Sequence, residues 1–326
     1  MTLTGMQKAA YDAVDKMIIS LEKELLTGYR ATQTALKDEV GKFYLTYLTG
    51  IPAEDHKIVA QQYNRLKALN KKFQGTYMAF GSDTYRQLKD GQLELFEEMY
   101  YRSQYTLSTF SDVTFNRLNP LVSEASVTGD IEVWKRIRDT ALRDRVKQIL
   151  PSSGLTLKDM LTENFTEELV RIQRTVKQGL MNGVPFKKQA EGIEDMFVGF
   201  ENNALRIVRT EGNRNANAAD YYNTQQTGIP VTRQWVATLD TRTRDRHQAL
   251  DGEMENSDGK FCIDGACARY PGDFGVPALD INCRCSVINI IDGVSPTARR
   301  GRDPFTGETS IASYENYEQW KKRHDV

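Results

Sequence analysis

The sequence predicts a mainly α-helical N-terminal region followed by a small α+β module near the C-terminus. Through most of the first 150 residues, apolar side chains recur at steps of three and four with Lys and Glu between them, which is the period of an amphipathic helix. From residue 232 the pattern changes to short alternating or β-branched runs between turn residues, which is typical of strands and hairpins. Two regions of different structural class are therefore expected in this chain of 326 residues.

The first two helices are expected to form a helical hairpin. Residues 6–27 carry the amphipathic pattern, Gly28 is predicted to end that helix, and a second helix is predicted from Tyr29 to Leu48. Further helices are expected at residues 59–73, at 83–107 with an interruption at Gly91, and at 131–141.

The clearest break in the chain is the run Pro151-Ser152-Ser153-Gly154, and we place a domain boundary there. Residues 1–150 then form a helical region that is expected to dock onto partner proteins. Residues 151–292 form a second domain, with helices first and the α+β module at 232–292. Residues 293–326 are expected to be an extended tail, which Tyr314, Tyr317 and Trp320 can anchor.

Three helices are predicted between this break and the module. Thr166 is expected to cap the first, which ends at Gly183-Val184-Pro185, and the others lie near 190–200 and 202–223.

The last of these helices carries polar groups on its apolar face. Glu211 and Asn215 interrupt the stripe, and burying them without partners would cost several kcal/mol. We therefore expect donors from the following module, with Arg242 or Arg244 as candidates. Arg209 and Glu211 can also be read as catalytic groups for ADP-ribosyl transfer, but the strand pattern that such an enzyme needs is missing.

Composition narrows the classes of partner. With 40% hydrophobic and 27% charged residues and a net charge of −1, the chain has no global attraction to nucleic acid or anionic membrane. The first residues do not resemble a signal peptide, and no apolar run is long enough to cross a membrane. We expect a protein made in and used from the cytoplasm, where cysteines are thiols or metal ligands more often than disulfides.

Almost all residue types that perform site chemistry gather between Trp235 and Cys285. The expected order there is a strand at 233–239, a short helix at 241–250, a turn, a hairpin and a closing strand at 283–291. Tetrahedral zinc accepts sulfur and imidazole ligands, and the candidates are His247, Cys262, Cys267, Cys283 and Cys285.

Two neighbouring thiols set a condition for that zinc site. Cys283 and Cys285 can share one ion only if the chain bends at Arg284, because residues i and i+2 of a strand lie about 7 Å apart. The alternatives are free buried thiols, or a disulfide formed after release from the cell.

Two enzymatic interpretations compete with the metal site. A cysteine nucleophile can pair with His247, oriented by Asp245 or Asp273, although no local signature of a cysteine protease is present. A divalent ion can bind the acidic residues of the same stretch as in a nuclease, but the arginines between them favour internal ion pairs. The residues in question are Asp240, Asp245 and Asp251, with Arg242, Arg244 and Arg246.

The same stretch resembles the phage Mu F-like minor head proteins, also called phage head morphogenesis proteins. The shared positions are Trp235, Asp240, the run from Thr241 to His247, Leu250-Asp251-Gly252, Phe261, Pro271-Gly272-Asp273 and Asn282-Cys283-Arg284-Cys285. Upstream, Ala204, Ile207-Val208-Arg209-Thr210-Glu211, Asn215 and Tyr221-Tyr222-Asn223 extend the resemblance, which covers residues 160–292. Cys262 and Cys267 are additions to the usual family pattern.

This resemblance implies a structural, non-enzymatic minor head protein of a tailed phage. It implies association with the portal protein, contacts with major capsid or scaffolding protein, and a role in head assembly and in DNA packaging or ejection. The expected location is the head interior, after assembly in the host cytoplasm, with neither a membrane nor a small-molecule substrate. For packaged DNA, the best basic patch is Arg299, Arg300 and Arg302. The alternative is an enzyme, either a metal-dependent hydrolase or a toxin-like ADP-ribosyltransferase, that uses His247 and nearby Cys and Asp residues.

Overall fold

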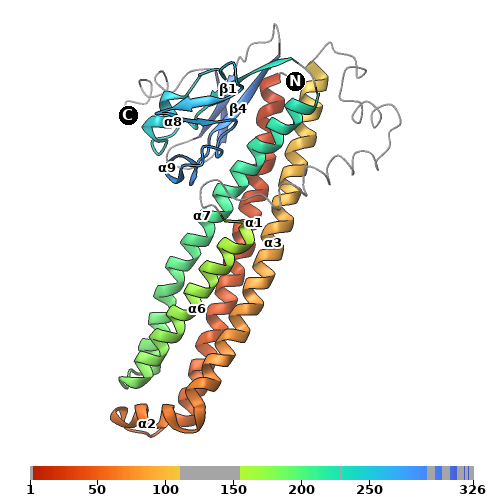
Figure 1. Cartoon of the computed structure of the whole chain (residues 1–326). Coiled ribbons are helices and arrows are strands. Elements are labelled where there is room, and N and C mark those ends of the chain that lie inside the picture. The colour runs from red at the N-terminus through yellow and green to blue at the C-terminus, as the bar shows by residue number, and fades with distance from the viewer. Residues whose placement is uncertain are drawn as a thin grey trace, which may run out of the picture. The chain divides into compact units, whose positions relative to one another are not determined.

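The computed structural model describes residues 3–110, 155–227, 230–291, 298–302 and 309–313, together with Gln319 and Lys322. The long helices are α1 (Leu3–Phe43), α3 (Arg65–Phe110), α6 (Leu157–Met181) and α7 (Phe186–Thr227) (Figure 1). The short ones are η1 (Tyr44–Leu48), η2 (Ala53–Asp55), α2 (His56–Gln61), η3 (Gln62–Asn64), α8 (Asp245–Ala249) and α9 (Pro277–Asp280). The strands are β1 (Val231–Val236), β2 (Phe261–Ile263), β3 (Ala266–Ala268), β4 (Ser286–Ile291), β5 (Ala298–Arg302) and β6 (Thr309–Ser313).

The predicted fold class is confirmed: long helices dominate the N-terminal region, and a few short strands lie near the C-terminus. Among the described residues, none of the helices has the length and apolar content that a membrane crossing requires.

The chain divides into two compact units, each built from separate stretches of sequence. The first contains Met1–Ile19, Asp90–Thr156 and Val208–Val326, and the second contains Ser20–Lys89 and Leu157–Ile207. Helices α1, α3 and α7 therefore each contribute residues to both units. The boundary predicted near Pro151 falls outside the described residues and stays a prediction, as does the helix at 131–141.

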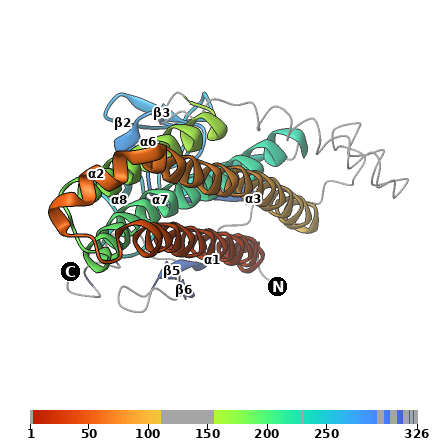
Figure 2. The same ribbon diagram turned by 90° about the horizontal axis from the view of Figure 1, so that it is seen from below.

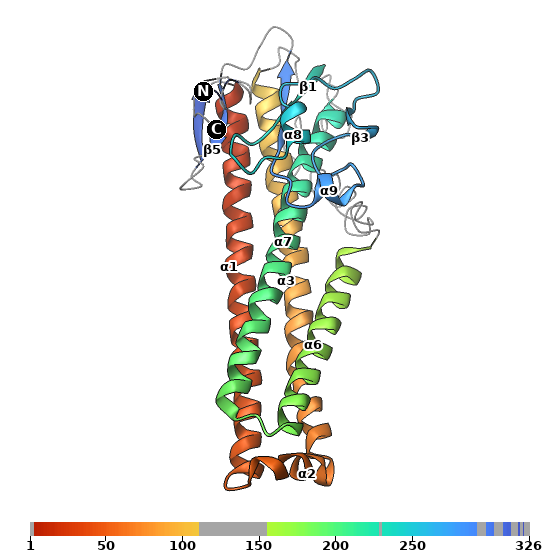
Figure 3. The same cartoon turned by 90° about the vertical axis from the view of Figure 1, so that its left-hand side faces the viewer.

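The second unit has an aromatic core supplied by α1, α3, α6 and α7, which run along one another there (Figures 2 and 3). Tyr29 lies 4.8 Å from Phe80 and 6.0 Å from Phe197, measured between ring centroids. Glu168 is buried in this core, where it accepts hydrogen bonds from Tyr29 at 3.2 Å and from Tyr77 at 2.5 Å. The carboxyl group is thus bound by two phenols inside a largely apolar environment.

The expected turn at Gly28 is wrong, because α1 continues through that residue to Phe43. A Cβ atom at position 28 would lie 2.9 Å from Cε2 of Phe80, so the glycine allows close helix packing instead of ending the helix. The chain turns after Leu48, where Gly50 has a φ of 76°. Likewise, α3 continues through Gly91.

Three other helix boundaries differ from expectation. The helix expected at 59–73 is interrupted before Arg65, because Tyr63 and Asn64 both have positive φ angles. Helix α6 begins at Leu157 and not at Thr166, and the two helices expected at 190–200 and 202–223 are the single helix α7. Periodicity located these helices, and packing set where they begin and end.

In the first unit, β1 and β4 pair antiparallel, with Trp235 opposite Val287. Trp235 is fully buried in a core cluster with Ala237, Leu250, Phe261, Ala268, Phe274, Leu279, Cys283, Cys285 and Val287. Strands β2 and β3 form a separate hairpin, and β5 pairs with β6 inside the segment expected to be an extended tail. Tyr314, Tyr317 and Trp320 lie outside the described residues.

Candidate metal centre

Three of the predicted metal ligands meet inside the first unit. His247 Nδ1 lies 3.3 Å from Cys285 Sγ and 3.7 Å from Cys283 Sγ. The possible ligand atoms of all three residues lie within 4.8 Å of one another. Each residue is at most 3% exposed. The site is therefore an internal cluster of one imidazole and two sulfur atoms.

Local structure explains how the two cysteines reach one imidazole. The left-handed conformation of Asn282, with φ of 56°, turns the chain, and the strand pairing of β4 begins only at Ser286. Cys283 and Cys285 thus lie in the irregular segment between this turn and β4, where both sulfur atoms reach the same imidazole. His247 projects from α8 against the edge of Trp235, with ring centroids 5.8 Å apart.

Arg284, between the two cysteines, is held by two neighbours. Its guanidinium donates to Asp240, with Nη2 2.9 Å from Oδ1, and its carbonyl accepts a hydrogen bond of 2.7 Å from Thr238 Oγ1. Asp240 is 2% exposed. Burial raises the pKa of Asp240. The hydrogen bonds from Arg284 and its positive charge outweigh burial, so the pKa of Asp240 lies below its usual value. We call Asp240 and Arg284 the carboxylate–arginine clamp.

Helix α7 holds the same loop from the other side. Asn213 and Asn217 both donate to the carbonyl of Cys285, at 3.2 and 3.1 Å, and Thr210 Oγ1 accepts from the amide of Asn282 at 2.9 Å. The three side chains are spaced by three and four positions and so share one helix face. The module contacts this helix as expected, but Thr210, Asn213 and Asn217 were not identified from the sequence as the residues that make the contact. Their helical spacing was the available signal.

The partners expected for Glu211 and Asn215 are wrong. Glu211 pairs with Arg214 of the same helix, and Asn215 donates to Gln92 of α3 at 3.0 Å. Arg244 donates instead to the carbonyls of Leu279, at 3.2 Å, and Ile281. Arg242 is largely exposed and lies 3.9 Å from Asp240. Glu211 and Asn215 therefore bind residues of α7 and α3, and not Arg242 or Arg244 of the module.

Other motif residues build the module. Asp251 accepts a hydrogen bond of 2.8 Å from the amide of Ala237. Gly272, with φ of 90°, packs on Arg214, and a Cβ atom there would lie 3.0 Å from Arg214 Cβ. Asp273 pairs with Arg269. These contacts assign structural roles to the residues that carry the resemblance.

The remaining two cysteines do not join the cluster. Cys262 and Cys267 stand opposite each other on β2 and β3 and form a disulfide. The metal assignment for these two is corrected accordingly, and for them the structure has the disulfide that was one of the alternatives. Their hairpin positions, which hold the two side chains together on the surface, explain the difference.

The three residues form a group that could hold a metal ion. Burial raises the pKa of Cys285, but hydrogen bonds from Cys283 and His247 outweigh it and hold that pKa well below the usual thiol value. The hydrogen bond with Cys285, together with burial, raises the pKa of Cys283. Zinc bonds of about 2.3 Å to sulfur and about 2.0 Å to nitrogen place tetrahedral ligands about 3.5 Å apart. The distances of 3.3 and 3.7 Å match this spacing.

The surroundings do not favour a nucleophilic site. Asp245 is exposed, Asp273 is bound to Arg269, and His247 Nε2 has no hydrogen-bond partner within the described part of the chain. No third group among those residues therefore orients the imidazole. Both sulfur atoms belong to buried residues, which an extended substrate cannot reach.

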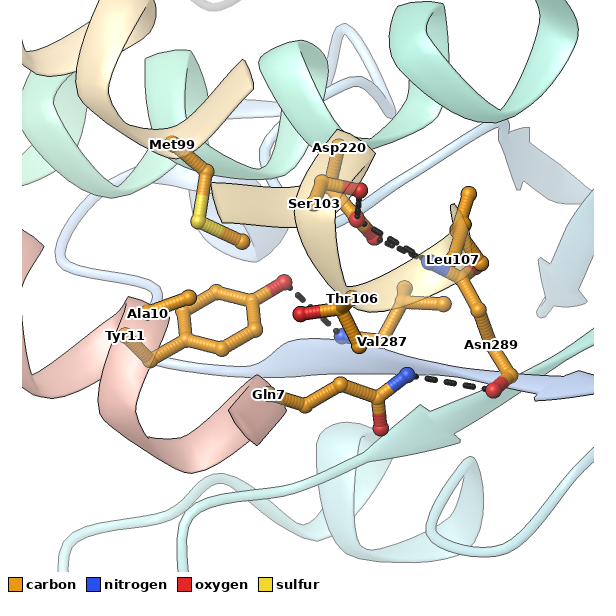
Figure 4. Close-up of a pocket in the computed structure, with 10 residues that line it drawn as sticks. All are labelled: Gln7, Ala10, Tyr11, Met99, Ser103, Thr106, Leu107, Asp220, Val287 and Asn289. Carbon is orange, nitrogen blue, oxygen red and sulfur yellow. Dashed lines mark hydrogen bonds between the residues drawn. The ribbon is translucent and has the colours of Figure 1, made fainter. Parts of the chain in front are cut away.

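A small cavity in the same unit is also unsuited to a substrate (Figure 4). Its volume is about 10 Å³, which is the size needed for one water molecule. Gln7 donates to the carbonyl of Asn289 at 3.1 Å, and the Asn289 amide donates to Asp220 at 2.9 Å. Burial raises the pKa of Asp220, against the hydrogen bonds from Ser103 and Asn289. The cavity joins α1, α3, α7 and β4.

The predicted DNA-binding arginines, Arg299, Arg300 and Arg302, lie on β5, in the hairpin with β6. Their role in DNA binding stays a prediction.

The chain is thus a mainly α-helical protein that carries a small α+β module. The module contains an internal cluster of His247, Cys283 and Cys285. Residues 170–288 match the family of Phage Mu protein F like proteins, so the resemblance to that family is confirmed for this part of the chain.

Curated relatives extend beyond that segment. Minor head protein GP7 of Bacillus phage SPP1 is 29% identical over 302 residues, which are 88% of this chain and 97% of GP7. NAD(+)–arginine ADP-ribosyltransferase EFV of Enterococcus faecalis is 25% identical over 98% of this chain, but the match spans only 59% of EFV. An uncharacterized protein of Haemophilus influenzae is 24% identical over 58% of this chain and 42% of its own length. No solved structure gives a significant match.

Proposed function

We propose that this chain is a structural minor head protein of a tailed phage, which associates with the portal and acts in head assembly. The carrying observation is that its similarity to GP7 extends over nearly the whole of that minor head protein. Contacts with major capsid or scaffolding protein and with packaged DNA belong to the same proposal. The proposed location is the head interior, after assembly in the host cytoplasm.

Residues 1–150 are proposed to dock onto the portal. Large apolar side chains are exposed near the turn between α1 and α3, including Leu45 at 76%, Ile58 at 56% and Tyr63 at 86%. Exposed aromatic and aliphatic side chains of this kind often carry binding energy at protein interfaces.

Copurification with portal tests this docking in the full chain. Replacing Leu45, Ile58 and Tyr63 together by Ser should lower portal association by about tenfold, because apolar contact area is lost. The matched control replaces Val170 and Val198, exposed on α6 and α7, by Ser and should retain association. Wild-type protein that is absent from purified heads would overturn the proposed function, whereas equal binding by both variants would overturn only this surface.

The proposed role of His247, Cys283 and Cys285 is to hold a structural zinc ion. When bound, zinc would supply ligand bonds that stabilise the folded module. The chain's own residues would orient the ligands, with the clamp at Arg284 and the amides of α7 fixing the loop.

DNA contact through Arg299, Arg300 and Arg302 is proposed from the basic sequence alone. Replacing all three by Gln should lower retention of double-stranded DNA, more strongly at low salt than at physiological salt. Unchanged retention at both salt concentrations would remove this contact from the proposal.

A second candidate function is ADP-ribosyl transfer, which the name of EFV suggests. Much of EFV lies outside the match, so the named activity need not reside in the shared part. In this chain Glu211 is 1% exposed and paired with Arg214, which disfavours it as a catalytic carboxylate. Incubation of the full chain with labelled NAD and an arginine acceptor should give no transfer above buffer, and transfer lost in Glu211→Gln would support the enzyme.

A further inference from the structure

The hairpin of β2 and β3 carries a cysteine pair that the metal centre does not use. Both residues are exposed, whereas Cys283 and Cys285 are buried. We infer that Cys262 and Cys267 form a reversible thiol–disulfide exchange site for small disulfides and thiols of the glutathione class. This inference does not depend on the proposed function.

Hairpin geometry brings the two sulfur atoms together. Asp264 and Gly265 have φ angles of 50° and 80°, as the two central residues of a type I′ turn require. Cys262 faces Cys267 directly, with their Cα atoms 4.1 Å apart. Ile263 and Ala266 flank the turn, and Cys262 and Cys267 form the next pair along the hairpin. At this second position the side chains of an antiparallel pair approach each other most closely.

The hairpin has other supports besides the disulfide. Phe261 and Ala268 are each 1% exposed and belong to the core cluster, and Phe261 lies 5.3 Å from Trp235 between ring centroids. The preceding loop is closed by two main-chain hydrogen bonds of 2.9 Å, from the amide of Asn256 to the carbonyl of Lys260 and from the amide of Gly259 to the carbonyl of Asn256. Reduction should therefore leave two adjacent thiols at the surface of a folded module.

The chemistry is a two-step exchange. The thiolate of Cys262, whose Sγ lies 3.6 Å from the side-chain amide of Asn256, attacks the small disulfide and releases one small thiol. The thiolate of Cys267 then attacks the mixed disulfide at Cys262 and releases the second. Two thiol protons and two electrons leave the protein pair, and one small disulfide becomes two thiols. Excess small thiol reverses both steps, as in a reducing cytosol.

The test follows thiol content in the native full chain. After incubation with reduced glutathione, alkylation should modify Cys262 and Cys267 at least about tenfold faster than the buried Cys283 and Cys285, with near-ultraviolet circular dichroism unchanged. After oxidised glutathione, mass spectrometry should show a peptide joining Cys262 to Cys267 that has lost two hydrogens and retains no glutathione.

Cys262→Ser is the matched variant, because it keeps one exposed thiol and removes its partner. It should accumulate a lasting glutathione adduct at Cys267. The inference is overturned if the wild-type pair resists reduced glutathione until the protein unfolds, or if wild type retains glutathione as the variant does.

Discussion

The Nδ1 atom of His247 lies 3.3 Å from the Sγ atom of Cys285, although the two residues are 38 positions apart. The contact joins α8 to the bend before β4, inside a cluster whose other members are mainly apolar. Polar groups in such a core cost free energy unless they bind one another or a ligand. A small domain usually needs a larger set of buried apolar side chains to be stable. In this module the cluster of sulfur atoms and imidazole occupies part of that core.

Asp240→Asn should weaken zinc binding by about 10- to 100-fold, because the clamp loses the carboxylate that holds Arg284 between the two ligands. Competition with a chromophoric chelator measures the affinity, and Co(II) absorption reports the ligand geometry. Asp245→Asn is the control, since Asp245 is exposed on α8. If both variants bind zinc as wild type does, the clamp has no positioning role.

Gly272→Ala should lower the free energy of unfolding by about 2–4 kcal/mol, because the residue has a positive φ angle and its new methyl group would press on Arg214. Gly265→Ala is the matched control, with a φ of 80° but open space around its Cβ position, and should lose only about 1 kcal/mol. Urea denaturation compares the two variants. Equal losses would mean that the contact with α7 contributes nothing.

Glu168→Gln should remove a pH dependence of stability in the second unit. Burial raises the pKa of Glu168 from 4.5 to about 7, against the hydrogen bonds from Tyr77 and Tyr29. Between those pH values the folded chain holds a proton that the unfolded chain has released. The free energy of unfolding should therefore fall as pH rises from 4.5 to 7, by about 3 kcal/mol, and then level off.

Denaturation at several pH values, with wild type and variant side by side, isolates this contribution. Glu167→Gln serves as the control, because Glu167 is exposed on the same helix. A difference between wild type and Glu168→Gln that stays constant from pH 4.5 to 7 would show that Glu168 does not hold its proton in the fold.

The sequence predicted the helices better than their ends. Apolar periodicity depends on neighbours three and four positions away, so it located the residues of α1, α6 and α7. Gly28 was misread because its role depends on Phe80, 52 positions later, through a contact of 2.9 Å for an added Cβ. Local pattern cannot separate a glycine that ends a helix from one that allows another helix to approach.

The candidate site was predicted in part for a similar reason. Residue type marked His247, Cys283 and Cys285, because few side chains other than Cys and His bind zinc. The other contacts depend on which segments pair in the fold. The hairpin register places Cys262 opposite Cys267, and the side-chain amides of Asn213 and Asn217 donate to the main-chain carbonyl of Cys285. Main-chain acceptors have no sequence signature, so these contacts required the structure.

Metal content tests the central claim, that a structural ion holds the module, most directly. Protein purified under reducing conditions should contain about one zinc per chain, and chelation should lower its melting temperature, because an ion bound only by the folded form stabilises it. His247→Ala should lose the metal and melt at the temperature of the chelated wild type. Much less than one zinc per chain, no change on chelation, and free thiols at both Cys283 and Cys285 would contradict the claim.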